Sequence, residues 1–151
     1  MKLIILSDTH GLLRPAVQVR LEGADAILHA GDVNTPAVVE ALRGFVPLYI
    51  VRGNNDKDWA ASLPLDLRFS LGGLAFHMVH DKRDLPADLA GVDVVVYGHS
   101  HRYAQEVRGG VLYLNPGSCG PRRFHQEITL AEMAIEDGAC RVEKIVLPHE
   151  P

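Results

Sequence analysis

The sequence predicts a single α/β domain over residues 1–151, in which two mixed β-sheets pack face to face with helices on their outer sides. In the first third, β-prone apolar runs alternate with helix-forming segments, and this order predicts parallel strands joined by right-handed crossovers. From Tyr103 onward, glycine-containing turns separate β-prone segments, which is typical of antiparallel strands. A chain of 151 residues is also long enough to bury a substantial core.

The first elements follow from apolar runs and helix punctuation. Leu3 to Leu6 is a continuous apolar run, which predicts a strand buried on both faces. A helix is expected over 15–22, because Pro15 suits a first helical turn and Gly23 ends the segment. The same reasoning predicts a strand over 25–29, a helix over 36–43 with Thr35 as its N-cap, and a strand over 46–51.

The remaining elements are mostly paired strands. Gly72-Gly73 predicts a hairpin between strands over 67–71 and 74–79. A short helix is expected over 85–90, with Pro86 in its first turn. The later pattern predicts a buried strand over 92–97, a hairpin of 105–108 with 111–114, and a hairpin of 128–135 with 141–147.

Composition narrows the function classes. Apolar residues make up 47% and charged residues 23%, as in an ordinary globular protein. The net charge of −4, from 15 Lys plus Arg against 19 Asp plus Glu, argues against a nucleic-acid polymer as partner. Cys119 and Cys140 form no CxxC motif, and the apolar N-terminal run is too short for a signal peptide or a membrane span. We therefore expect a reduced, cytoplasmic protein with no membrane partner.

Polar residues gather where the predicted strands end. Asp8 and His10 are two residues apart, as are His99 and His101, so at an extended strand end each pair would point in one direction. His80 ends the hairpin strand. Because functional loops cluster at the carboxyl ends of parallel strands, these patches should meet. The candidate ligands are Asp8, His10, Asp32, Asn54, His80, His99 and His101.

This ligand set indicates a chemistry. Oxygen and imidazole ligands without thiolate suit Mn²⁺, Fe, Zn²⁺, Ni²⁺ or Co²⁺ rather than Ca²⁺. Two adjacent ions clamp a phosphoryl group and lower the pKa of a shared water. Two divalent ions, Asp8, Asp32 and a bridging hydroxide leave a net charge of about +1, which favours an anionic phosphate ester. The sequence therefore predicts a two-metal hydrolase of a small phosphate ester.

Together these motifs, with Asn115-Pro-Gly-Ser118, resemble the signature of calcineurin-like metallophosphoesterases. The short chain resembles the small phosphodiesterase branch, which also contains the retromer subunit vacuolar sorting protein 29. The resemblance implies a four-layer αββα fold, with Asp32, Asn54 and His99 in catalytic positions. It also implies one ion held by Asp8, His10, Asp32 and His101, and a second held by Asp32, Asn54, His80 and His99, with Asp32 bridging.

Two positions depart from the family pattern. Asn55 stands where many relatives have a histidine that assists the leaving group, and an amide cannot act as a general acid. The family's His-Gly is His80-Asp81 here, which adds a carboxylate beside the metals. Asn55, Arg122 and His125 are candidate substrate contacts, Arg122 as a bidentate phosphate ligand.

Other polar residues have simpler interpretations. His29 is expected to be a hydrogen-bonded core histidine and His77 a surface residue. Asp56 either orients a ligand or caps a turn.

The favoured function is a phosphodiesterase with two divalent ions, Mn²⁺ preferred. One alternative is a catalytically weak protein-binding scaffold of the retromer-subunit type, although a scaffold that had lost catalysis should also lose ligands. The other is a phosphomonoesterase or pyrophosphohydrolase. The sequence leaves the physiological substrate and homo-oligomerisation open.

Overall fold

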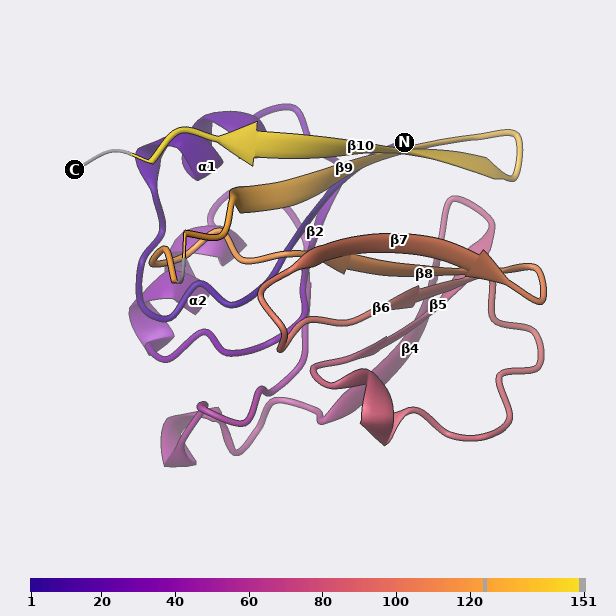
Figure 1. Cartoon of the computed structure of the whole chain (residues 1–151), viewed down its shortest axis with the longest axis horizontal. Coiled ribbons are helices and arrows are strands. Elements are labelled where there is room, and N and C mark those ends of the chain that lie inside the picture. Colours follow the sequence, from indigo (N-terminus) through magenta and orange to yellow (C-terminus); the bar gives the residue numbers. More distant parts are fainter. Residues whose placement is uncertain (124, 150–151) are drawn as a thin grey trace.

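The computed structural model describes residues 1–123 and 125–149, and its two five-stranded sheets lie face to face (Figure 1). The first sheet has the order β10-β9-β1-β2-β3. Its strands β1, β2 and β3 are parallel, whereas β9 is antiparallel to β1 and β10 is antiparallel to β9. The strands of this sheet span Lys2–Leu6 (β1), Ala26–His29 (β2), Leu48–Ile50 (β3), Ile128–Glu136 (β9) and Ala139–Leu147 (β10).

The second sheet has the order β4-β5-β6-β8-β7 and is also mixed. Strands β5, β6 and β8 are parallel, and the antiparallel strands β4 and β7 form its edges. Its strands span Asp66–Leu71 (β4), Leu74–Val79 (β5), Val94–Val96 (β6), Tyr103–Arg108 (β7) and Val111–Pro116 (β8). The predicted α/β class with two mixed sheets is therefore confirmed, and the single domain over 1–151 stays a prediction.

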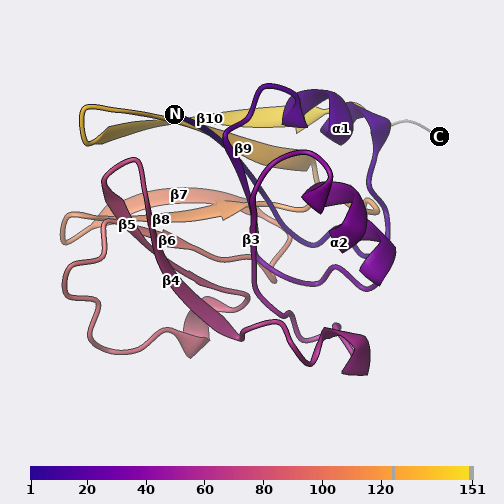
Figure 2. The same ribbon diagram turned by 180° about the vertical axis from the view of Figure 1, so that it is seen from behind.

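Two α-helices cover the outer face of the first sheet (Figure 2). Helix α1 spans Pro15–Leu21 and helix α2 spans Pro36–Arg43, each with proline at its start as predicted. Thr35 occupies the N-cap position of α2, but its side chain makes no capping hydrogen bond. Val17 and Leu42 pack with Ile4 of β1, so this layer buries one face of the parallel strands.

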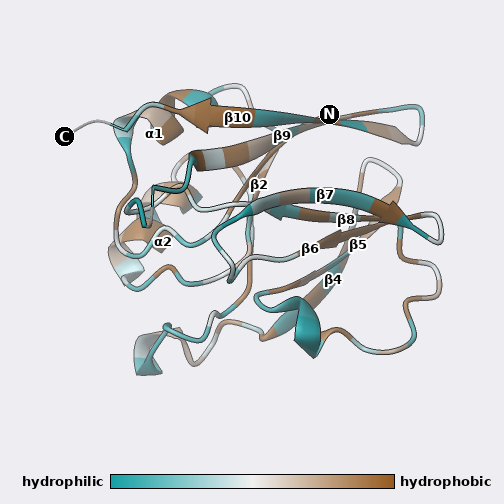
Figure 3. Ribbon diagram, viewed as in Figure 1, coloured by the Kyte–Doolittle hydropathy of each residue, from teal (hydrophilic) through white to brown (hydrophobic). Residues whose placement is uncertain are grey.

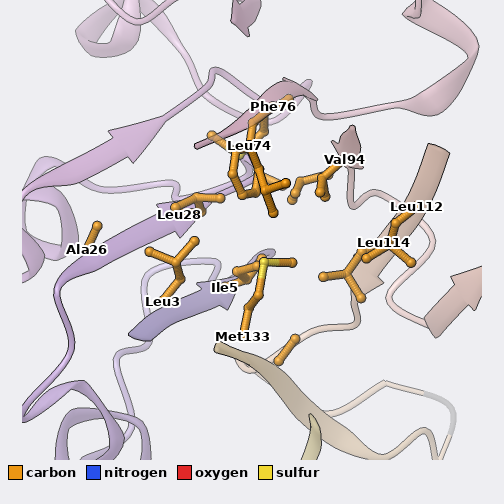
Figure 4. Packing of buried hydrophobic residues seen from close by; sticks show 14 of the residues in the cluster. Leu3, Ile5, Ala26, Leu28, Leu74, Phe76, Val94, Leu112, Leu114 and Met133 are labelled. Carbon is orange, nitrogen blue, oxygen red and sulfur yellow. The ribbon is translucent and has the colours of Figure 1, made fainter. Parts of the chain in front are cut away.

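The main core lies between the two sheets (Figure 4). Leu3 and Ile5 of β1 meet Phe76 of β5 and Leu114 of β8 there. Because Ile4 faces the helices while Leu3 and Ile5 face the other sheet, β1 is buried on both sides. The apolar run that predicted this strand is thus explained by its two packing faces.

The predicted helix over 85–90 is wrong. Leu85 lies before Pro86, a position that disfavours helix, and its backbone is extended with φ −66° and ψ 142°. The Asp88 carboxylate accepts a hydrogen bond from the Ala90 amide, which favours a turn over a helix. Leu85 and Leu89 nonetheless pack against the outer face of the second sheet. This loop therefore covers that face in place of a helix, and Lys82 of the preceding 3-10 turn η2, Lys82–Asp84, lies over the Tyr97 ring.

The central strand β6 is hydrophobic throughout, whereas the edge strand β7 carries hydrophilic residues along much of its length (Figure 3). Helices α1 and α2 have 7 and 8 residues. No helix in the described part of the chain is long and apolar enough to cross a membrane.

Replacing Phe76 with alanine should lower the free energy of unfolding by about 3–5 kcal/mol, because it leaves a cavity between the sheets. Phe76 is 1% exposed and stacks on Phe69 with ring centroids 5.2 Å apart. Val107→Ala is the control, because this side chain is 68% exposed and should change stability little. Urea denaturation measures both, and equal losses would contradict this view of the core.

Candidate metal centre

The predicted ligands lie at the carboxyl ends of the parallel strands of both sheets. Asp8 follows β1, Asp32 follows β2 and Asn54 follows β3 in the first sheet. His80 follows β5, and His99 and His101 follow β6 in the second. The face-to-face packing brings these two sets of loops together, so residues up to 93 positions apart in sequence share one site.

Two buried carboxylates form the middle of this site. Oδ1 of Asp8 lies 3.4 Å from Nε2 of His101, 3.7 Å from Nε2 of His10 and 3.9 Å from Nε2 of His80. Oδ2 of Asp32 lies 3.2 Å from Nε2 of His80 and 3.7 Å from Nε2 of His10. Two overlapping groups could therefore hold an ion, one of Asp8, His10 and His101 and one of Asp8, Asp32 and His80.

The backbone at the site is left-handed, which differs from the sequence-based expectation. The values of φ are 56° at Asp8, 45° at His10, 61° at Asp32, 75° at His99 and 64° at His101. Asp8 and His10 therefore approach to 3.7 Å in a left-handed turn, and not because they continue an extended strand, whereas His101 faces Asp8 and His99 faces Asp81. Non-glycine residues with positive φ are uncommon and cluster at functional sites, where the surrounding structure enforces them.

Electrostatics around Asp8 favour its ionised form. Burial opposes the charge of this fully buried side chain, but the imidazoles of His10 and His101 outweigh burial and hold the pKa of Asp8 well below its usual value. Burial likewise opposes the charge of Asp32, and contact with His80 lowers the pKa of Asp32 below its usual value. The site therefore keeps two carboxylates negative in the interior.

Five buried side-chain atoms of the described residues lack a hydrogen-bond partner, among them Nδ1 of His101, and two of the five face the buried carboxylate cluster. These two are Oδ1 of Asp8 and Nε2 of His80. The Nδ1 nitrogen of His80 lies 2.7 Å from the Ala30 carbonyl oxygen, to which it must donate, so Nε2 is the nitrogen of the neutral ring that can offer a lone pair to a metal ion. Unpaired buried polar atoms are costly, and a metal ligand with its other nitrogen bonded to a carbonyl is the usual arrangement. The residues present therefore fit a divalent metal ion.

Asn54 and His99 form a more open part of the site. Oδ1 of Asn54 lies 3.3 Å from Nδ1 of His99, and the His99 side chain is 41% exposed. The His99 ring meets the His80 ring edge to face, with centroids 5.3 Å apart. This pair borders a cavity of about 630 Å³ that Arg52, Leu65 and Arg83 also line.

Asp56 holds the loop that carries Asp32. Its two carboxylate oxygens accept hydrogen bonds from the backbone amides of Asp32, Val33, Asn34 and Gly53, at 2.8–3.0 Å. The side chain is buried, and it ties the loop after β2 to the loop after β3. Of the two roles expected for Asp56, it therefore orients a predicted ligand through the backbone.

Two further side chains orient the carboxylates themselves. The hydroxyl of Ser7 donates to Oδ2 of Asp8 at 2.7 Å. Asn55 donates to Asp32 twice, from its backbone amide at 2.8 Å and from its side-chain amide at 3.0 Å. Asn55, predicted as a substrate contact, is thus engaged with Asp32. Ser7 had no signal in the sequence beyond its place next to Asp8.

His29 has the structural role expected for it. Its Nδ1 accepts from the Gly31 amide at 3.0 Å, so its Nε2 carries the proton and donates to the Thr9 hydroxyl, also at 3.0 Å. Burial lowers the pKa of His29 to about 4.

His77 was expected at the surface, and this expectation is wrong. The ring is only 2% exposed. Its Nδ1 accepts from Arg68, whose guanidinium also donates to the carbonyl of Asp88 in the loop over the second sheet. That loop packs over the outer face of the sheet from which His77 projects, and a local pattern in the sequence does not encode its path.

Arg122 and His125 lie apart from the predicted ligands. They line a cavity of about 230 Å³ that contains none of the seven residues. The Arg122 guanidinium donates to the carbonyls of His125 and Gln126 and contacts His149. Arg123, in contrast, borders a cavity of about 290 Å³ together with His99 and His101. Substrate contact by Arg122 and His125 stays a prediction that this geometry does not favour.

The chain is similar in sequence and in structure to known phosphoesterases. Residues 1–138 match the calcineurin-like phosphoesterase superfamily domain. The chain is 30% identical to the probable metallophosphoesterase YsnB of Bacillus subtilis strain 168, over 94% of this chain and 89% of that protein. A structure described as a novel archaeal phosphodiesterase superposes with a TM-score of 0.80 at 26% identity, over 97% of this chain and 100% of the other. Vps29 of Chaetomium thermophilum superposes with a TM-score of 0.78 over 97% of both chains, and at 21% identity this shows a shared fold alone.

Replacing Asp56 with asparagine should lower the free energy of unfolding by about 3 kcal/mol. In either orientation the new amide NH₂ would face two backbone N–H groups that now donate to a carboxylate oxygen. Asp58→Asn, at an exposed position in the following 3-10 turn, is the matched control and should be nearly neutral. Urea denaturation measures both; similar losses would show that Asp56 does not hold the loops.

His29 should stay neutral in the folded protein until the pH approaches its pKa of about 4. Since the unfolded chain binds this proton near the ordinary pKa of 6.5, the free energy of unfolding should fall as the pH drops from about 6.5 to about 4. Imidazole NMR titration and urea denaturation over this range measure the two effects. A His29→Gln variant should show a flatter pH dependence, and a His29 ring protonated at pH 6 in the folded protein would contradict the assignment.

Proposed function

The chain belongs to the calcineurin-like phosphoesterase superfamily, and on this premise we propose that it hydrolyses a phosphodiester with the help of two divalent metal ions. Metal-dependent phosphoester hydrolysis is the activity of its family, and the chain carries the donor groups that such chemistry needs. The observation that carries the proposal is the pair of unpartnered buried ligand atoms, Oδ1 of Asp8 and Nε2 of His80, at the centre of the imidazole cluster.

The proposed ligands divide into two sets. Asp8, His10, Asp32 and His101 would hold the first ion, and Asp32, Asn54, His80 and His99 the second. The position of Asp32 Oδ2 supports its bridging role, because it lies between His10 of the first set and His80 of the second, at 3.7 and 3.2 Å. Oxygen and nitrogen donors without thiolate are compatible with Mn²⁺, the ion we propose, and also with Fe, Zn²⁺, Ni²⁺ or Co²⁺. When bound, such ions neutralise phosphoryl oxygens and lower the pKa of a water molecule.

The remaining residues explain how a substrate could be held. Ser7 and Asn55 fix the two carboxylates by hydrogen bonds, so the charged centre is in place before substrate binds. The cavity of about 630 Å³ beside Asn54 and His99 has room for the second ester group that distinguishes a diester from a monoester. The walls of this cavity carry charges of both signs, Arg52 and Arg83 with Asp66, Asp81 and Asp84, so attraction of an anionic substrate would come from the bound ions. These features support a diester over a bare phosphate monoester.

Protonation of the leaving group is the catalytic step that the residues of this site support least. Asn55 cannot donate a proton as a general acid, and its amide is bonded to Asp32. We therefore propose that the protein prefers diesters with good leaving groups, such as aryl alcohols. The name of the archaeal neighbour, a phosphodiesterase, supports the same substrate class.

Asp32→Asn tests the metal assignment. The amide keeps the size of the side chain and tolerates the positive φ at this position, but it removes the bridging charge. We expect bound Mn²⁺ to fall from about two ions per chain to one or fewer, and hydrolysis of a chromogenic aryl diester to fall at least about 100-fold. Elemental analysis and a steady-state assay measure the two effects.

Asp137→Asn, at another position with positive φ in the turn between β9 and β10, is the matched control and should keep full activity. Circular dichroism checks that both variants fold. Wild-type activity in Asp32→Asn would refute the metal assignment. Faster turnover of the corresponding monoester by the wild type would refute the diester preference, and absence of any turnover with stable capture of a protein partner would favour the scaffold alternative.

A further inference from the structure

Asp81 is the acidic residue that follows the proposed ligand His80, and it faces a second proposed ligand. Its Oδ2 lies 3.7 Å from Nε2 of His99. The side chain is 17% exposed, whereas His99 is 41% exposed and is the least enclosed imidazole of those that face Asp8, Asp32 or Asp81. The ligand with the most rotational freedom therefore has a carboxylate next to its outer nitrogen.

The Asp81 carboxylate is itself held in place by Arg83. Nη2 of Arg83 lies 2.6 Å from Oδ2, and Nε lies 3.1 and 3.0 Å from Oδ1 and Oδ2. The backbone amide of Arg83 donates to Oδ1 at 3.0 Å, so Asp81 also caps the 3-10 turn η2. With Arg83 donating to both oxygens, the Asp81 carboxylate is fixed in one orientation, with Oδ2 toward His99. The ion pair is also neutral as a whole, so it adds little net charge to the site.

The two nitrogens of His99 thus face different groups. Nδ1 lies 3.3 Å from Oδ1 of Asn54, and Nε2 faces Asp81. A histidine that binds a metal offers a lone pair on one nitrogen and carries its proton on the other, which commonly bonds a carboxylate. Because the Asn54 oxygen can only accept, Nδ1 of the metal-free ring donates to it. When an ion binds beside Asn54, Nδ1 would offer its lone pair to the ion and the ring proton would move to Nε2, which faces Asp81. The 3.7 Å separation exceeds a hydrogen bond, so closure requires a small turn of the exposed ring.

We propose that Asp81, clamped by Arg83, is a positioning residue that accepts a hydrogen bond from Nε2 of metal-bound His99 and so directs Nδ1 toward the second metal ion, next to Asn54. This inference rests on the proposed two-metal function, because the second ion is the one that Asn54 and His99 would share. Asp81 and Arg83 then determine how tightly the outer ion is held, while the inner group of Asp8, His10 and His101 is independent of them.

The experiment titrates the metal-free full-length protein with Mn²⁺ by calorimetry. The wild type should show two binding steps. In Asp81→Asn the first step should be unchanged and the second weakened by about 10- to 100-fold, as for loss of a carboxylate behind a ligating histidine. Asp84→Asn is the matched control: it lies in the same turn and lines the same cavity, and it should bind both ions like the wild type.

Arg83→Gln separates positioning from simple charge attraction. If Asp81 acts by orienting His99, loss of its clamp should weaken the second step. If Asp81 instead bound the ion or attracted it through space, removing the positive charge of Arg83 should tighten that step, and this result would overturn the proposal. Imidazole ¹⁵N NMR of the protein loaded with diamagnetic Zn²⁺ gives a second readout: His99 should coordinate through Nδ1 and carry its proton on Nε2 in the wild type, and this state should be less populated in Asp81→Asn.

The outcomes are distinguishable. An unchanged second step in Asp81→Asn, or loss of both steps in a variant that folds normally by circular dichroism, would overturn the positioning role and leave the proposed function intact. A wild-type protein that binds no Mn²⁺ would overturn the proposed function itself, before any variant is compared.

Discussion

Burial of the Asp8 and Asp32 carboxylates between the two sheets is the constraint on which the site depends. A negative charge in a protein interior is costly unless positive groups and hydrogen-bond donors surround it. Here imidazoles from both sheets, the Ser7 hydroxyl and the Asn55 amides surround the pair. The left-handed turns after the buried strands deliver these groups, and the Asp56 carboxylate holds the turn that carries Asp32. The fold therefore supplies both the burial and the compensation.

Much of this arrangement could be predicted from the sequence, because its strongest signals are local. Strands alternate with helices in the first third of the chain, where helices begin at Pro15 and Pro36, and this alternation predicts parallel strands. The loops that follow parallel strands meet at one edge of the sheet. The predicted helix over 85–90 was wrong because Pro86 was interpreted as the start of a helix. The residue before a proline disfavours a helical backbone, and Leu85 is extended. The burial of His77 was missed because it depends on the path of that same loop.

The types of residue at the site could be predicted from the sequence, but the backbone conformation that brings them together could not. Spacing of two residues correctly brought Asp8 to His10, although a left-handed turn, and not an extended strand, achieves it, whereas His101 faces Asp8 and His99 faces Asp81. Asp56 and Asn55 act by hydrogen bonds to backbone and carboxylate, and no spacing rule identifies such partners. Arg122 follows the Asn115 segment closely in sequence, yet its guanidinium is bonded within its own loop. Proximity along the chain is a poor guide to which loops share a cavity.

The origin of the ligands in both sheets has a consequence for folding. Before the sheets dock, the donors after β1 and β2 are separated from those after β5 and β6, so a complete binding site does not exist in a partly folded chain. An ion could bind there only after the sheets have docked, and it would then oppose their separation. A ligand that binds only the native state adds to the stability of that state. Metal supply would then control resistance to proteolysis as well as turnover. A chain starved of its ion would be expected to open first along the line between the sheets.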